Sequence, residues 1–287
     1  MQKSLPAAEN GGGMLSLKTP FDALPLVCVD VETTGLSPDK GARVCEVALL
    51  RSEGEREVAR FESLVHPQQP IPPEVIGVHG ITDAMVAEAP VFATLLPDVR
   101  DVLQGAVVVG HNVHFDLRFL RHEWHVAGEE LPECVAIDTL ALARTHFDFP
   151  QNGLGAIAAA LGIVHTSAHR AMGDVLATWN VLQHFVAELK RRGPVTLADL
   201  ILPRVPDAAG AGIRELVTTL QDALPESAPL CMRYRAWRAS ETFRVVQPLA
   251  VYFQRGYGFL HAFCHLRREE RHFRLDRILE LRPLGDE

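Results

Sequence analysis

Two acidic residues, Asp30 and Glu32, lie two positions apart in an apolar run that ends at Thr33-Thr34-Gly35. A short apolar run with this ending predicts a buried strand that leads into a turn. Alternate residues of a strand share a face, so both carboxylates would point into the same small volume. Two neighbouring anions in a half-buried sheet are costly unless a cation holds them. The pair suggests a metal site, and the alternative is that one acid caps a turn or lies at an exposed strand end.

Two further acidic residues follow other expected elements. Asp116 falls in the first turn of a helix expected from about His114 to Trp124, directly after an apolar strand. Functional sites of α/β sheets gather at such strand ends, although the helix dipole alone also favours an acid in the first turn. Asp174 interrupts the apolar face of the longest expected helix, where the alternative is a buried acid with a satisfied partner. His169 reaches the same site only from the loop before that helix.

Taken together, the four acids and the histidine favour a metal site over the separate alternatives. Oxygen ligands suit Mg²⁺ or Mn²⁺, and bridging carboxylates can hold two such ions about 4 Å apart. In phosphoryl chemistry one ion activates a water and the other stabilises the leaving oxygen. A histidine, whose intrinsic pKa lies near neutrality, can accept the proton of that water. The pattern therefore predicts phosphoryl chemistry with two divalent cations.

The spacing of these residues resembles the three motifs of the DEDDh 3′–5′ exonucleases, the DnaQ-like family whose best-known member is the epsilon subunit of bacterial DNA polymerase III. The resemblance covers residues 22 to 190, and no catalytic position is substituted. A histidine at position 169, rather than a tyrosine near Asp174, is typical of the h-type branch. The matching segments are Asp30-x-Glu32-Thr33-Thr34-Gly35, Pro72 to Thr82, Asn112-x-x-Phe115-Asp116 and His169-x-x-x-x-Asp174.

The resemblance implies a role for each of these residues. His169 would be the general base, and two divalent metal ions would be bound by the four acids, Asp30, Glu32, Asp116 and Asp174. The implied fold is ribonuclease H-like. The implied substrate is a nucleic-acid 3′ end.

The resemblance also implies residues that contact this substrate. Thr33, Thr34 and the backbone after them would hold the 3′-terminal nucleotide, with Leu36 wedged against its base. Glu74 and His79 would contact the terminal sugar and phosphate, although a turn-stabilising role is an equal alternative for His79. Five other histidines match no motif and are expected to be surface or packing residues: His66, His122, His125, His146 and His165.

The elements that position these residues follow from periodicity over an expected domain of residues 22–192. Residues 42–52 and 57–66 are expected to form an antiparallel meander with the first strand. Two apolar runs, 106–110 and 134–137, are expected as further strands, and the longest helix is expected to follow them. A meander followed by alternating strands and helices predicts an α/β domain with a mixed sheet flanked by helices.

The composition of the 287 residues, 47% hydrophobic and 22% charged, is that of an ordinary soluble globular protein. No apolar run approaches the roughly 20 residues that a membrane-spanning helix needs, so no membrane partner is expected. Residues 1–21 read as a flexible leader rather than a secretion signal. The five cysteines are scattered without a CxxC pair, which favours buried thiols in a reducing compartment and a cytoplasmic location.

The C-terminal part differs in composition and in periodicity. Residues 193–228 are rich in Pro, Ala and Gly around one short helix expected over 213–224, which is typical of a linker. Residues 229–287 show only short strand patterns, and they carry eleven arginines against seven acidic residues in a chain of net charge −8. Arginine suits phosphate contacts. A small all-β domain that holds an anionic ligand is therefore expected.

This last segment resembles the WYL domain, a small Sm-like or SH3-like β-barrel found beside DNA-binding proteins. The namesake triplet is Gly258-Phe259-Leu260, which keeps the leucine and changes the first aromatic residue. The resemblance implies that arginines line a pocket for nucleic acid or a nucleotide-like ligand. The alternative is that they pair with neighbouring acids on a solvated surface. The candidate arginines are Arg244, Arg271, Arg274 and Arg277.

As a whole, the sequence predicts a metal-dependent 3′–5′ exonuclease that hydrolyses terminal phosphodiesters of DNA, or of RNA, to nucleoside 5′-monophosphates. Two alternatives stay open: an exoribonuclease of the same fold, and a ligand-sensing regulator whose first domain only binds nucleic-acid ends. Because no polymerase domain is recognised in the sequence, a polymerase or repair partner would act in trans. The oligomeric state and the ligand of the C-terminal domain are not predicted.

Overall fold

The computed structural model describes residues 16–132, 134–165, 168–201, 211–224, 228–235, 240–254 and 257–284. The described residues therefore leave out most of the expected leader, the middle of the expected linker and part of the expected C-terminal all-β domain. No helix within the described ranges is both long and apolar enough for a membrane span. None of the five cysteines, all of which are described, is in a disulfide.

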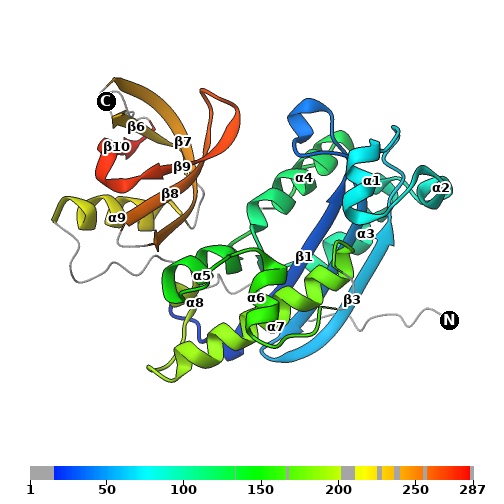
Figure 1. The fold of residues 1–287 in the computed structure, drawn as a ribbon, viewed down its shortest axis with the longest axis horizontal. Helices are drawn as coiled ribbons and strands as arrows, with labels where there is room; N and C mark the ends of the chain where they lie inside the picture. The colour runs from blue at the N-terminus through cyan, green and yellow to red at the C-terminus, as the bar shows by residue number, and fades with distance from the viewer. Residues whose placement is uncertain are drawn as a thin grey trace.

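The first unit of the fold is a five-stranded mixed sheet with the strand order β3-β2-β1-β4-β5 (Figure 1). Strands β1, β2 and β3 form an antiparallel meander, and β4 and β5 run parallel to β1. This is the mixed sheet that the sequence predicts. The strands are β1 (Pro25–Thr33), β2 (Val44–Glu53), β3 (Arg56–Leu64), β4 (Val107–Gly110) and β5 (Ala136–Asp138).

Helices cover both faces of this sheet, and each face has its own core. Val27 and Leu49 pack with α3 and α4, whereas Cys28 and Leu50 pack with α7 on the opposite face. Because both faces are covered, β1 and β2 are apolar along most of their length. The helices are α1 (Pro73–His79), α2 (Asp83–Val86), α3 (Phe92–Leu103), α4 (Val113–Val126), α5 (Thr139–His146), α6 (Leu154–Ala160), α7 (Ala171–Lys190) and α8 (Leu197–Ile201).

The second unit is a five-stranded antiparallel sheet with the order β10-β6-β7-β8-β9, which we call the tail sheet. The expected small all-β unit is thereby confirmed. Helix α9 (Ala211–Ala223), expected within the linker, contributes Val217 and Leu220 to the core of this sheet. The strands are β6 (Leu230–Arg235), β7 (Glu241–Gln254), β8 (Tyr257–Cys264), β9 (Glu269–Arg274) and β10 (Ile278–Pro283).

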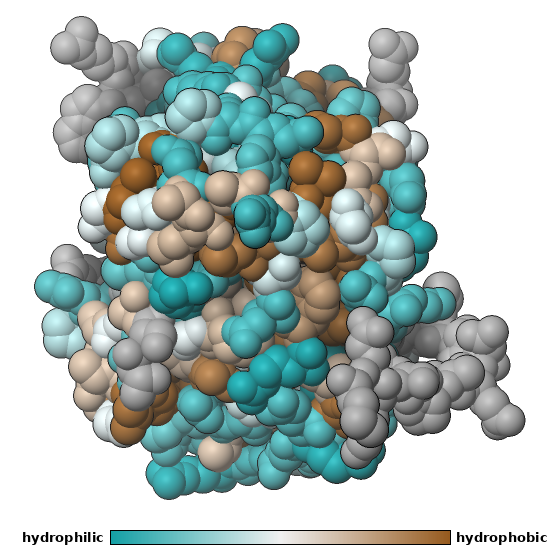
Figure 2. Space-filling view, turned by 90° about the vertical axis from the view of Figure 1, so that its right-hand side faces the viewer, coloured by the Kyte–Doolittle hydropathy of each residue, from teal (hydrophilic) through white to brown (hydrophobic). Residues whose placement is uncertain are grey.

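Hydrophilic residues cover most of the face at the α1–α2 end of the molecule, where hydrophobic residues form small separate groups (Figure 2). Three large apolar side chains stand out among the described residues because they are mostly exposed. Leu36, Val164 and Phe243 are 83%, 78% and 76% exposed. Leu36 follows β1, Val164 precedes α7, and Phe243 lies in β7, so each is close to one of the sites described next.

Candidate active site

Asp30 and Glu32 lie on the part of β1 that extends past the carboxyl end of β4. The parallel pairing of β1 with β4 ends at Cys28 opposite Val109, whereas β1 continues to Thr33. The carboxyl ends of strands border the crevice in which α/β sheets bind their ligands. Both carboxylates are only half-buried, although Val29 and Val31 between and beside them are buried. The two acids therefore lie, partly exposed, at the end of the sheet where such sites form.

Three of the four predicted acids meet at this strand end. One carboxylate oxygen from each of Asp30, Glu32 and Asp174 lies within 4.8 Å of the other two. Asp174 comes from the first turn of α7, the helix that packs on β1. Three carboxylate oxygens at this separation can share a hard divalent cation such as Mg²⁺ or Mn²⁺.

Asp116 lies beside this cluster and is held there by the backbone. Its buried Oδ1 accepts a hydrogen bond of 3.0 Å from the N–H of Val31. The turn from β4 into α4 is tight, since a Cβ on Gly110 would lie 2.9 Å from the first residue of α4. Asn112 adopts the left-handed region (φ 66°) and donates its N–H to Asp138 at 2.9 Å. This turn directs the first turn of α4 against β1.

The electrostatics of the cluster favour a bound cation. Burial raises the pKa of Asp30 well above its usual value, and the charges of Asp116 and Asp174 raise it further. Burial, followed by the charges of Asp174 and Glu46, raises the pKa of Glu32 to about 8. A divalent cation would reverse these shifts, because its charge stabilises the ionised carboxylates.

The two histidines before α7 differ in their contacts. His165, expected from the sequence to be a surface or packing residue, places Nε2 at 2.5 Å from Oδ1 of Asp174. His169 is exposed, with φ 61° in the left-handed region, two residues before α7 begins. Residues 166–167 between them lie outside the described residues. Nothing in the motif spacing points to His165, because its contact depends on the path of this loop.

Glu46 and Arg170 form an ion pair beside the cluster that no motif indicates. Glu46 lies opposite Glu32 in the pairing of β1 with β2. Its carboxylate accepts three hydrogen bonds of 2.5–3.1 Å from the Arg170 guanidinium. The same carboxylate accepts the N–H of Ala171, the first residue of α7, at 2.9 Å. Glu46 therefore fixes the start of the helix that carries Asp174.

Replacing Glu46 with glutamine is expected to lower the free energy of unfolding by about 1–3 kcal/mol. The amide keeps one acceptor oxygen, but it has no charge and it turns the second acceptor, which faces Arg170 and the Ala171 N–H, into a donor. Denaturant unfolding measures the change. Glu57→Gln is a matched control, since Glu57 loses only an exposed ion pair with Arg60 on β3. That variant is expected to stay within about 0.5 kcal/mol of the unaltered protein. Equal stabilities of the two variants would contradict the role of Glu46.

Three of the predicted substrate-contacting residues, Thr33, Thr34 and Leu36, lie at the end of β1 and in the loop before the 3₁₀ turn η2 (Pro38–Lys40). Thr33 Oγ1 donates to the carbonyl of Gly35 at 2.7 Å. The N–H of Thr34 donates to the carbonyl of Arg43 at 2.8 Å. These bonds order the loop, while the Leu36 side chain projects into solvent, where a ligand can reach it.

Glu74 and His79 belong to α1. Glu74 is exposed in the first turn of the helix. His79 is buried: its Nδ1 accepts the N–H of Ile81 at 2.9 Å, and its Nε2 lies 3.8 Å from Sγ of Cys45. Burial lowers the pKa of His79. The bond to Ile81 is the kind of contact that the turn-stabilising alternative for His79 requires.

Two of the four predicted tail arginines are paired with near neighbours. Arg271 lies 2.9 Å from Glu269 in the same strand. Arg274 lies 2.6 Å from Asp276, and its guanidinium carbon is 3.9 Å from the ring centroid of Tyr257. These are contacts that arginines on a solvated surface make. Arg277 ends the 3₁₀ turn η3 (Leu275–Arg277). Arg244 is among the residues that line a pocket of the tail sheet.

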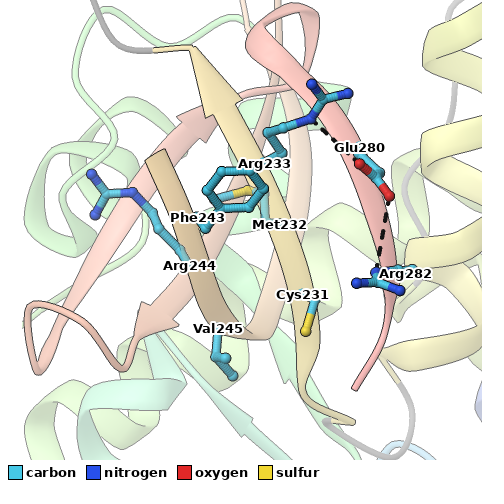
Figure 3. Close-up of a pocket in the computed structure, with 8 residues that line it drawn as sticks. All are labelled: Cys231, Met232, Arg233, Phe243, Arg244, Val245, Glu280 and Arg282. Carbon is cyan, nitrogen blue, oxygen red and sulfur yellow. Dashed lines mark ion pairs between the residues drawn. The ribbon is translucent and has the colours of Figure 1, made fainter. Parts of the chain in front are cut away.

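That pocket lies on β6, β7 and β10 and has a volume of about 250 Å³ (Figure 3). Phe243 occupies its centre, and Glu280 lies 3.3 Å from Arg233 and 3.9 Å from Arg282. The lining therefore combines three arginines and an exposed aromatic ring with a single acid. The lining residues are Cys231, Met232, Arg233, Phe243, Arg244, Val245, Glu280 and Arg282.

Comparison with known proteins identifies both units. The family model described as Exonuclease matches residues 27–182, more than half of the chain. The chain belongs to the exonuclease family. The WYL domain model matches residues 215–283, a range that includes most of α9 and the tail sheet. Both resemblances seen in the sequence are confirmed.

Curated relatives of this exonuclease-family chain include polymerase-associated proteins. The DNA polymerase III subunit epsilon-like protein of Rhodobacter capsulatus is 37% identical over 196 residues, which are 67% of this chain and 28% of the relative. The 3′–5′ exonuclease DinG of Bacillus subtilis is 34% identical over 61% of this chain and 19% of its own. The chain thus spans less than a third of the length of either relative. The DNA polymerase III subunit epsilon of Treponema pallidum is 30% identical, over 55% of this chain and 74% of its own.

Solved exonucleases share the fold. E. coli exonuclease I in complex with a dT13 oligonucleotide has a TM-score of 0.54 and 18% identity, over 84% of this chain and 55% of that one. The nuclease domain of 3′hExo, a DEDDh family member bound to rAMP, has a TM-score of 0.51 and 17% identity, over 57% of this chain and 92% of that one. The predicted ribonuclease H-like fold is confirmed. Exonucleases of the DEDDh family depend on metals, and the acidic cluster on β1 and α7 suits such an ion.

Proposed function

We propose that this chain hydrolyses the terminal phosphodiester bond at nucleic-acid 3′ ends, of DNA in preference to RNA, and releases nucleoside 5′-monophosphates. The observation that carries the proposal is the meeting of Asp30, Glu32 and Asp174 within 4.8 Å in an exonuclease-family chain. A protein that only binds nucleic-acid ends would not need these three acids together with Asp116. Their negative charges repel one another, so the cluster is costly unless it holds a cation. The proposal is therefore favoured over a regulator that only binds ends.

Two divalent cations, Mg²⁺ or Mn²⁺, would be held by Asp30, Glu32, Asp116 and Asp174. When bound, these ions supply Lewis-acid activation of the attacking water and stabilise charge on the leaving 3′-oxygen. Asp116 keeps Oδ1 on the Val31 N–H and offers its other oxygen to the site. Asp174 would exchange its contact with His165 for a contact with an ion.

His169 would accept the proton of the attacking water. It lies just before α7, within five residues of Asp174, and its exposure leaves the imidazole open to solvent and substrate. His165 is the competing candidate because it contacts Asp174 directly. We favour His169, since its imidazole is exposed and it matches the family motif, whereas Nε2 of His165 lies against an Asp174 oxygen that a cation would take.

The 3′-terminal nucleotide would lie against Thr33, Thr34 and Leu36, with Glu74 and His79 near its sugar and phosphate. Relatives named as DNA polymerase III epsilon subunits, together with exonuclease I in complex with a DNA oligonucleotide, support DNA as the preferred substrate. The 3′hExo domain bound to rAMP is the basis for the RNA alternative. A polymerase or repair protein acting in trans is the proposed partner.

Digestion of oligonucleotides by the purified protein tests this function. DNA and RNA strands labelled at the 5′ end would be incubated with Mg²⁺, Mn²⁺ or a chelator. The expected result is a ladder of products shortened from the 3′ end, with release of 5′-monophosphates, that the chelator abolishes. Faster digestion of RNA would select the exoribonuclease alternative. Binding of either strand without digestion under any metal condition would refute the nuclease and select the regulator.

For the tail, we propose that the pocket around Phe243 binds an anionic, nucleotide-like part of a nucleic-acid strand. Arg233 and Arg282 can contact phosphates, and the exposed Phe243 ring beside them can stack on a base. The lining holds one acid, Glu280, which lies beside Arg233 and Arg282 (Figure 3). Arg233 also pairs with Glu241 at 3.4 Å. Arg244 is among the lining residues, but its guanidinium bonds Thr242 Oγ1 at 3.0 Å and Cys264 Sγ at 3.4 Å on the other face of the tail sheet. Arg271, Arg274 and Arg277 are not among the lining residues.

Replacing Phe243 with alanine is expected to weaken oligonucleotide binding by the full chain about 5- to 100-fold, because stacking on one base is worth roughly 1–3 kcal/mol. Fluorescence anisotropy with a labelled single-stranded oligonucleotide measures the dissociation constant. Leu284→Ala is the control, since Leu284 is an exposed apolar residue outside the pocket. An unchanged affinity in the Phe243 variant would exclude base stacking at this ring.

A further inference from the structure

The tail sheet contacts the exonuclease unit through buried, specifically packed side chains. Helix α5 packs on β7, and the tail sheet lies beside α4 and α5 in Figure 1. The Arg144 guanidinium carbon of α5 lies 4.8 Å from the ring centroid of Tyr252 in β7. The rings of His114 in α4 and His261 in β8, both buried, meet edge to face with centroids 6.0 Å apart.

Glu270 of β9 carries a negative charge into this contact. Its Oε2 lies 3.2 Å from Nε2 of His261, and its Oε1 lies 3.6 Å from Nη1 of Arg118 on α4. Although burial raises the pKa of Glu270, the hydrogen bond with His261 and the charge of Arg118 lower it overall. The side chains of Arg118 and Glu270 are only 20% and 17% exposed. Their attraction is therefore screened less than that of a surface pair.

Arg118 extends the connection to the active site. Its Nη2 donates a hydrogen bond of 2.8 Å to the carbonyl of Leu36. The Leu36 side chain is 83% exposed, so packing does little to fix the loop at this position. A single guanidinium therefore joins Glu270 of the tail sheet to the loop that follows β1.

We propose that Glu270 is a positioning residue of the exonuclease site, which acts through Arg118 to fix the loop that carries Leu36. The inference rests on the proposed function, in which Leu36 contacts the base of the 3′-terminal nucleotide. The carboxylate restrains the guanidinium in the orientation that bonds the Leu36 carbonyl, and without it the long side chain has more rotamers available. The tail sheet thus controls how tightly the 3′ end is held. The chemical step is not affected, because other contacts hold the four acids.

Steady-state kinetics of the full chain on a 5′-labelled single-stranded oligonucleotide tests this inference. Glu270→Gln, which keeps the shape and removes the charge, is expected to raise KM about three- to tenfold and to change kcat less than about twofold. Glu57→Gln, which removes an ion pair on β3, is the matched control and is expected to match the unaltered protein. Arg118→Ala is expected to raise KM at least as much. Adding Glu270→Gln to Arg118→Ala is expected to have no further effect, since both act through one connection.

A second readout does not depend on cleavage. An oligonucleotide with 2-aminopurine at its 3′ end reports stacking by its fluorescence, and Asp116→Asn provides a background that is expected to bind without cleaving. In that background, Glu270→Gln is expected to weaken the quenching and the affinity together. The inference is overturned if Glu270→Gln and Glu57→Gln give the same KM and the same quenching, or if only kcat falls. Failure of the unaltered protein to digest any 3′ end would refute the proposed function instead. The fluorescence and affinity measurements would still test whether Glu270 acts on the Leu36 loop through Arg118.

Discussion

The Asp116→Asn variant is expected to lose metal-dependent nucleotide release by roughly 10²–10³-fold in kcat, while it keeps its fold. In the unaltered protein the Val31 N–H donates to Oδ1 of Asp116 at 3.0 Å. Asparagine also has an Oδ1 that can accept this bond, but its side chain carries no charge to bind the cations. Burial raises the pKa of Asp116, which means that the folded protein disfavours the charged carboxylate when no cation is bound. A neutral side chain is therefore expected to leave the melting temperature of the metal-free protein unchanged or to raise it.

Asp83→Asn is the matched control for this variant. Asp83 also accepts a backbone hydrogen bond, from Ile71 at 2.9 Å, but it belongs to α2 and not to the acidic cluster. Digestion of end-labelled DNA with Mg²⁺ or Mn²⁺, together with thermal melts, compares the two variants. Full activity of Asp116→Asn would disprove its assignment as a metal ligand. A collapse of its melting temperature would show that the charge serves the fold.

The His169→Ala variant is expected to lose about 10²–10⁴-fold in kcat, the usual contribution of general-base catalysis. His165→Ala is expected to lose at most about tenfold, since His165 contacts a proposed metal ligand and would act only through Asp174. Rates of digestion of end-labelled DNA, measured for both variants with Mg²⁺ and with Mn²⁺, compare the two roles.

A titration with Mn²⁺ provides the control for this pair. Because His165 and a cation compete for the same Asp174 oxygen, the Mn²⁺ concentration for half-maximal activity is expected to shift in His165→Ala. It is expected to stay constant in His169→Ala. The reverse pattern, with the larger loss of kcat in His165→Ala, would make His165 the general base and His169 a surface residue.

The main features of the nuclease unit could be predicted from the sequence because they depend on local patterns. The alternation in β1 places Asp30 and Glu32 on one face of the strand, and in the structure this face meets Asp174 of α7. The apolar runs of β1, β2 and β4 predict a sheet buried on both faces. The spacing of the motifs indicated the family, which the match to residues 27–182 confirms. Helix ends differ by only one or two residues from those expected, as with α4, which is expected from about His114 to Trp124 and covers Val113–Val126.

The tail shows where such patterns are insufficient. Arginine content and a motif indicate an anionic ligand, but each arginine's role depends on its neighbours across the tail sheet. Arg274 is paired with Asp276, whereas Arg233, which no motif singled out, lines the pocket. Strand patterns likewise could not assign α9 to the core of the tail sheet, because that packing depends on residues tens of positions away.

The sequence by itself determined which residues can do chemistry and which elements carry them: the acids of β1, α4 and α7, and the histidine before α7. Only the tertiary structure decided which of their neighbours support them. His165 on Asp174, Arg170 on Glu46 and Arg118 between Glu270 and Leu36 are contacts of the folded chain. The physical reason is one of range. Periodicity and motif spacing report on residues a few positions apart, whereas the last two of these contacts join residues 82 to 152 positions apart that meet only when sheets and helices pack.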